Sequence, residues 1–107
     1  MANWYTQEVE TLFQAILTLN SVEECRLFFE DACTVKEMRE ISQRLQVARM
    51  LRNGSSYAAI NAETGVSTAT ISRVSRCLEY GSGGYDLVLE RIAEEKPGPA
   101  NSPAIHP

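Results

Sequence analysis

The sequence has almost no histidine. Its 107 residues include a single one, His106, which stands next to last. A Ser-His-Asp triad or a histidine-ligated metal site needs a histidine held in a folded core, and the GxxxxGK[ST] and GxGxxG phosphate-binding patterns are absent as well. The many glutamates of the first half lie on predicted helices, where we interpret them as solvated faces. We therefore expect no enzyme activity, no metal and no cofactor.

Cysteine and long apolar runs are also scarce. The three cysteines, Cys25, Cys33 and Cys77, include no CxxC pair, which argues against a disulfide framework or a zinc cluster and favours packed thiols. No apolar run approaches the roughly 18–20 residues of a transmembrane helix, and residues 1–5 do not open a secretory signal. We expect a cytoplasmic protein with no membrane partner.

Charge is unevenly distributed along the chain, whose net charge is −4. Residues 1–40 hold eight acidic and three basic side chains, and residues 79–107 hold five and two. Residues 41–78 instead hold five arginines and one glutamate. Arginine suits bidentate contacts with phosphates and base edges, so this basic segment is compatible with nucleic-acid binding. Scattered surface arginines would give the same count, and charge alone does not separate the two interpretations.

Apolar residues recur at spacings of three and four, and no alternating pattern typical of strands occurs. Ser21 with Glu24 and Thr34 with Glu37 have the spacing of capping boxes, which mark the starts of two helices. The sequence therefore predicts an all-α fold with six helices. The expected helices cover residues 3–19, about 22–33, about 35–51, 57–64, about 68–80 and about 85–95.

The same periodicity predicts which side chains are buried. The helix over about 35–51 turns one apolar face inward, and the helices over 57–64 and 68–80 share a core where they cross. The predicted inward positions of the first are Met38, Ile41, Leu45, Ala48 and Leu51. Those of the crossing pair are Ile60, Val66, Ile71 and Val74.

Proline becomes frequent only at the end of the chain. Four prolines fall within residues 97–107. Because proline disrupts helices, this segment cannot continue the preceding helix. A chain of this length supports a single core, since domains typically have about 100–150 residues. We predict one helical domain over residues 1–96 and a disordered, proline-rich tail over 97–107.

The segment over residues 56–76 has the pattern of a helix-turn-helix. Two short helices flank Gly65-Val66-Ser67, and Gly65 supplies the positive φ of a tight turn between crossing helices. The second helix opens with small and polar residues, Thr68 to Ser72, which let its backbone approach base edges in a major groove. A helical corner in an ordinary core has the same bare pattern, so the segment alone is only moderately specific.

Three stretches extend the pattern beyond the turn. They are Thr34–Arg44, with the sequence TVKEMREISQR, Leu51–Gly54, with LRNG, and Gly65–Arg73, with GVSTATISR. In order and spacing they resemble the Trp repressor family, in particular its YerC/YecD-like branch, over residues from about 27 to 92. The resemblance implies six helices and an intertwined homodimer whose second motif helices enter successive major grooves of double-stranded DNA.

The small and polar opening of the second helix, together with the resemblance, predicts DNA contacts on both helices of the motif. Ala69 and the threonine methyl groups are placed to touch thymine methyls, while hydroxyl groups reach bases or phosphates. We expect Thr70 to influence which sequence is preferred and Arg76 to contact a phosphate. The expected DNA-contacting residues are Tyr57, Ala58, Asn61, Ser67, Thr68, Ala69, Thr70, Ser72 and Arg76.

In the family, an indole ring is held between two arginines, and the resemblance implies a candidate effector site here. Arg44 and Arg73 stand at the matching positions, and Thr34 matches the residue at the start of the third helix. Val74 stands where tryptophan-binding members carry glycine, and Cys77 stands where they carry serine. A β-branched side chain fills space that an indole needs, and the alternative role for both arginines is a phosphate contact or a surface ion pair.

These patterns predict a homodimeric, sequence-specific transcriptional regulator, a repressor that binds a near-palindromic site in double-stranded DNA. Two alternatives stay open. One is a helical interaction or dimerisation module without DNA binding. The other is a repressor gated by a small-molecule corepressor, tryptophan or another small planar metabolite.

Overall fold

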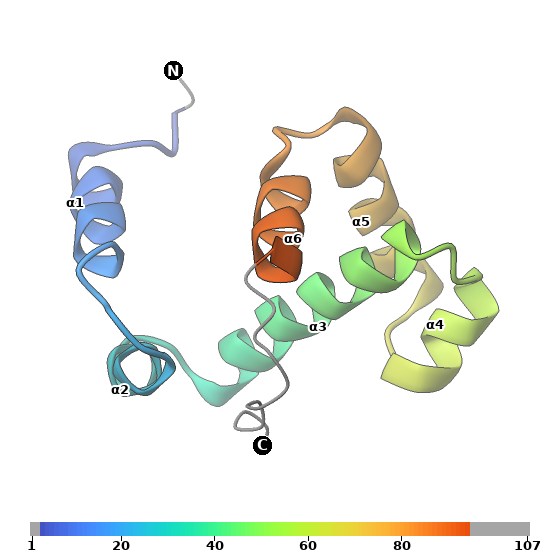
Figure 1. Cartoon of the computed structure of the whole chain (residues 1–107), viewed down its shortest axis with the longest axis horizontal. Helices are drawn as coiled ribbons and strands as arrows, with labels where there is room; N and C mark the ends of the chain where they lie inside the picture. Colours follow the sequence, from blue (N-terminus) through green and yellow to red (C-terminus); the bar gives the residue numbers. More distant parts are fainter. Residues whose placement is uncertain (1–2, 95–107) are drawn as a thin grey trace. The chain divides into compact units, whose positions relative to one another are not determined.

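The computed structural model describes residues 3–94 (Figure 1). The tail predicted to be disordered over residues 97–107 lies outside the described residues. Within them the chain forms six α-helices and no strand, which confirms the predicted all-α fold. No helix in this part of the chain is long and apolar enough to cross a membrane. The helices are α1 Gln7–Ile16, α2 Val22–Ala32, α3 Val35–Arg52, α4 Tyr57–Thr64, α5 Thr68–Tyr80 and α6 Gly84–Glu94.

Side-chain caps define the starts of the helices. Thr34 and Glu37 form a reciprocal capping box, because Glu37 N donates to Thr34 Oγ1 at 3.0 Å and Thr34 N donates to Glu37 Oε1 at 2.9 Å. Ser21 Oγ accepts from Glu24 N at 3.1 Å. Each such cap stabilises its helix by about 1 kcal/mol. Both caps were predicted at the positions where α2 and α3 begin. Only the box of Thr34 is reciprocal, because Glu24 Oε1 accepts from Asn20 N at 2.8 Å.

The first helix is shorter than the prediction of residues 3–19. Thr6 Oγ1 accepts a hydrogen bond from Val9 N at 3.3 Å, so Thr6 is the N-cap of α1. At the other end, Thr18 N donates to Ala15 O at 3.1 Å, a tighter turn than the α-helical one. Apolar spacing continues beyond both of these residues, and for that reason periodicity alone overestimated the length.

The described chain divides into two compact units between Glu40 and Ile41. In the N-terminal unit, which contains α1 and α2, no residue of either helix is buried. Tyr5 and Phe13 meet edge to face with ring centroids 5.7 Å apart, and Phe28 and Phe29 do so at 5.1 Å. Much of the apolar surface of these two helices is therefore open to solvent.

The C-terminal unit, which begins at Ile41, contains the buried core. All four side chains predicted for the crossing pair of helices are buried, as is Leu89 of α6. On α3 the predicted face is only partly right, because Ile41 is 50% exposed while Val47, which was not predicted, is completely buried together with Ala48. Packing against the other helices, rather than spacing along α3, decides which of its apolar residues are covered.

Replacing Gly65 by alanine tests the turn between α4 and α5. Gly65 has φ +75°, and a Cβ added there would meet nothing within 4 Å, so the cost arises from the backbone conformation alone. We expect Gly65→Ala to lower the free energy of unfolding by about 1–2 kcal/mol in urea denaturation.

Gly84→Ala is the matched control, since its Cβ also meets nothing within 4 Å and its φ is not positive. We expect this variant to be neutral or more stable by about 0.4–1 kcal/mol. Equal destabilisation by the two substitutions would show that the positive φ of Gly65 does not matter.

Candidate nucleic-acid interface

The turn of the helix-turn-helix is built by hydrogen bonds local in sequence. Gly65 is the left-handed C-cap of α4, and its N–H donates to Asn61 O at 2.8 Å. Val66 N donates to Thr64 Oγ1 at 3.1 Å. Ser67 is the N-cap of α5, and its Oγ accepts from Thr70 N at 3.2 Å. The direction in which α5 leaves the turn is therefore fixed by the residues of the turn itself.

Asn61, a predicted DNA contact, has a structural role in this turn. Its Nδ2 donates to the Val66 carbonyl at 2.9 Å, joining the middle of α4 to the residue before the α5 cap. Thr70 is also engaged within the motif. Its Oγ1 accepts from the Ser67 hydroxyl at 3.2 Å, and its side chain is half-buried.

The remaining predicted contacts form an exposed surface of the motif. On α5, Ala69, Ser72 and Arg76 recur at helical spacing on the side opposite the buried Ile71 and Val74. This side of the helix is free for a partner. The predicted DNA-contacting residues that are exposed are Tyr57, Ala58, Asn61, Ser67, Thr68, Ala69, Ser72 and Arg76.

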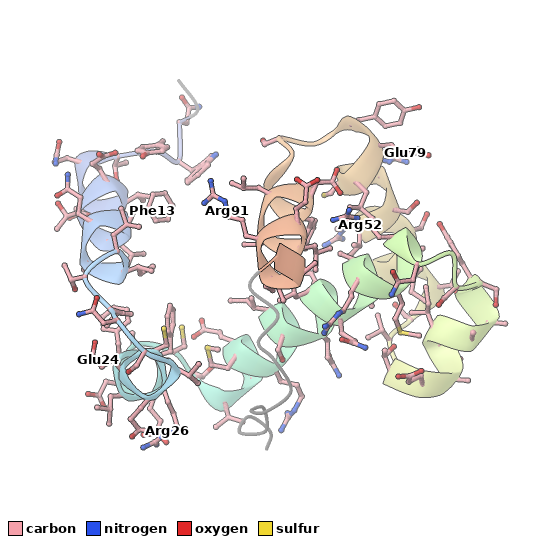
Figure 2. All side chains as sticks on the ribbon, viewed as in Figure 1. Phe13, Glu24, Arg26, Arg52, Glu79 and Arg91 are labelled. Atoms are coloured by element: carbon pink, nitrogen blue, oxygen red, sulfur yellow. The ribbon has the colours of Figure 1, made fainter. Side chains whose placement is uncertain are left out.

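The exposed arginines of α5 differ from Arg26 of α2 in their ion pairing. Arg73 and Arg76 make no ion pair with any residue in the range 3–94. On α2, in contrast, Arg26, which is labelled in Figure 2, pairs with Glu23 at 2.5 Å and with Glu30 at 3.1 Å. Hydrogen bonds from Arg26 also hold the pKa of the exposed Glu23 carboxyl below its ordinary value. The two cationic groups of α5 are thus available to an external anion.

The five arginines of residues 41–78 lie on two helices, α3 and α5, and differ in their surroundings. Arg49 and Arg52 of α3 line a cleft of about 240 Å³ together with Leu89 and Glu90 of α6. Arg52 Nε also lies 3.6 Å from Asp86 Oδ1. This leaves Arg73 and Arg76 as the positive charge of the helix-turn-helix surface.

A larger cleft, of about 520 Å³, lies between α3, α5 and α6. Its lining is mostly apolar, with the half-buried Arg44 as its single charged residue. The segment Gly81–Gly84 forms one wall, and a Cβ at Gly81 would lie 2.4 Å from Cys77 O, so only glycine fits there. The remaining lining residues are Ile41, Leu45, Cys77, Tyr85 and Val88.

Of the five residues predicted as an effector site, the cleft brings together Arg44 and Cys77. Val74 is 1% exposed and belongs to the core, Arg73 is exposed away from the lining, and Thr34 caps α3 within the N-terminal unit. The expectation of packed thiols is wrong for Cys77, which is exposed. Tyr85 and Val88 were not predicted to line a site. The signal that could have found them is the glycine run before them, because glycine permits a close approach of the backbone.

Comparison with known proteins extends these observations to the whole helical region. The model of the family described as Trp repressor protein matches residues 7–93, from α1 to α6. The chain belongs to the Trp repressor family. It is 53% identical over 88 residues to the protein YerC of Bacillus subtilis, covering 82% of this chain and 85% of that protein. This relative confirms the resemblance to the YerC-like branch.

Two solved structures of the Trp repressor type share the fold. One is a TrpR-like protein from Eubacterium eligens, with a TM-score of 0.80 and 56% identity, covering 82% of this chain and 91% of the other. The second, from Staphylococcus aureus, has a TM-score of 0.81 and 50% identity, covering 84% of this chain and 90% of the other. The six-helix fold is therefore that of the family.

The hydrogen bond from Asn61 to Val66 yields a prediction about stability. We expect Asn61→Ala to lower the free energy of unfolding by about 1 kcal/mol, because the partly buried Val66 carbonyl loses its donor. The matched control is Asn53→Ala, since Asn53 is exposed and its side chain makes no hydrogen bond within residues 3–94. In urea denaturation, the free energy of unfolding should change little in Asn53→Ala. A similar loss of stability in both variants would contradict the role of Asn61.

Proposed function

We propose that this chain is a sequence-specific transcriptional regulator, a repressor and not an enzyme, which inserts α5 into the major groove of double-stranded DNA. The observation that supports it best is the outer face of α5. The small side chains of Thr68, Ala69 and Ser72 come first, and the unpaired Arg73 and Arg76 follow. Small residues permit close approach to base edges, and free guanidinium groups bind phosphates.

The proposed regulator acts as a homodimer in the cytoplasm, with residues 1–96 as its domain. Exposed apolar side chains support a dimer, because a partner that covers them removes apolar surface from water. Trp4 is 61% exposed, Val35 is 72% exposed, and Leu17 and Val22 are each 82% exposed. A two-fold axis would present two copies of α5 to half-sites about 34–36 Å apart on DNA.

A second candidate is a regulator whose DNA binding requires a small molecule. The cleft between α3, α5 and α6 favours it, because an apolar lining with one arginine suits a small apolar metabolite that carries an anionic group. Val74 argues against tryptophan as that molecule. The resemblance implies glycine at this position in tryptophan-binding members, and the valine side chain fills space that an indole needs.

Selection from a random pool of duplex DNA at moderate salt tests the proposal. We expect enrichment of a near-palindrome with half-site centres about 10 base pairs apart, without any added small molecule. Enrichment only in a parallel selection with L-tryptophan would favour the gated regulator. Lack of enrichment in both selections would contradict the proposal and favour a helical interaction module that does not bind DNA.

Arg76→Ala tests the phosphate contact separately. A dimer would lose two phosphate contacts, so we expect weaker binding to all sequences alike. The slope of log affinity against log salt concentration should become less steep by about 2. Arg26→Ala is the control, because Arg26 is exposed but already paired with Glu23 and Glu30. An unchanged slope for Arg76→Ala would exclude a phosphate contact at this position.

A further inference from the structure

Apart from Arg73 and Arg76, the surface proposed to contact DNA has almost no side chain that distinguishes bases by hydrogen bonding. Arginine and lysine recognise guanine, asparagine and glutamine recognise adenine, and carboxylates recognise cytosine. From residue 53 to residue 72 the chain contains no arginine, lysine or glutamine. The amide of Asn61 is held by the Val66 carbonyl. Glu63 lines a hollow with Ser42 and Gln46 of α3.

The hydroxyl groups of this surface supply little discrimination. Ser67 and Thr70 are engaged with each other through their hydroxyls, and Ser67 also caps α5. Tyr57, Thr68 and Ser72 are exposed, but a hydroxyl both donates and accepts and so pairs with the edge of any base. These groups can bind the grooves or phosphates without selecting a sequence.

Methyl groups are the remaining chemical feature of the surface. Ala69 lies in the first turn of α5 on the side opposite the buried Ile71 and Val74. Ala58 is exposed in the first turn of α4, and the exposed Thr68 adds its own methyl group beside Ala69. The apolar group that a base pair presents in the major groove is the C5-methyl of thymine.

We propose that the chain recognises its operator mainly through thymine methyl groups, so that each half-site has A·T pairs where the first turns of α4 and α5 face the groove. Ala69 is the central contact, and the exposed Ala58 and the Thr68 methyl supply further ones. Arg73 and Arg76 lie farther along α5 and anchor the phosphates. The inference rests on the proposed DNA-binding function and specifies the class of sequence that is bound.

Replacing thymine by deoxyuridine tests this mode of recognition, because it removes only the methyl and leaves the hydrogen-bonding edges unchanged. The probe is the duplex enriched in the selection, with deoxyuridine introduced at one thymine position at a time. We expect each contacted thymine to lose about fourfold in affinity, the value of one buried methyl group. The loss should be confined to a few positions within each half-site.

Variants of Ala69 connect the effect to the protein. The two variants are Ala69→Gly and Ala69→Ser, of which the second keeps more helix propensity. In both, the ratio of the affinity for the thymine duplex to that for the deoxyuridine duplex should fall to about one at the position that Ala69 contacts. Ala93→Gly, at an exposed alanine of α6, should keep the full ratio.

The outcomes distinguish this inference from the function on which it rests. A selected operator that tolerates deoxyuridine within twofold at every thymine would overturn methyl recognition while leaving DNA binding in place. A deoxyuridine effect that persists unchanged in both Ala69 variants would assign it to DNA shape and also overturn the inference. Absence of any selected duplex would instead remove the proposed function itself.

Discussion

The turn between α4 and α5 is the constraint on which the rest of the C-terminal unit depends. Gly65 takes a left-handed conformation that side chains rarely adopt, and Asn61 bridges across the turn to the Val66 carbonyl. These two features set the crossing of the helices, so that Ile60 and Ile71 meet with no exposed surface. With its inner side held in this way, α5 presents small and cationic side chains outward.

The core that supports this surface is small. Seven hydrophobic residues are buried among those described, all from α3, α4, α5, α6 and the turn. The N-terminal helices add apolar surface without burying it. The proposed homodimer would account for both facts, because exposed apolar residues of each copy could complete the core of the other. Stability and the spacing of the two DNA-reading helices would then depend on the same association.

Features that depend on neighbours in sequence were predictable. Thr34 with Glu37 has the spacing of a capping box, and the structure contains both of its hydrogen bonds. The position of the glycine turn and the buried Ile60, Val66, Ile71 and Val74 also followed from spacing. The first helix was predicted too long, because apolar periodicity does not register the competing hydrogen bonds of Thr6 and Thr18.

The sequence by itself determined the six helices, most of their ends and the helix-turn-helix, since caps, glycine and periodicity act over a few residues. Only the tertiary structure decided that Val47 rather than Ile41 is covered, that Asn61 serves the turn, and that Arg44 shares a cleft with α6. Each of these depends on partners brought close by folding. Spacing along one helix restricts which of its faces can be buried. The neighbouring helices then determine which face is buried.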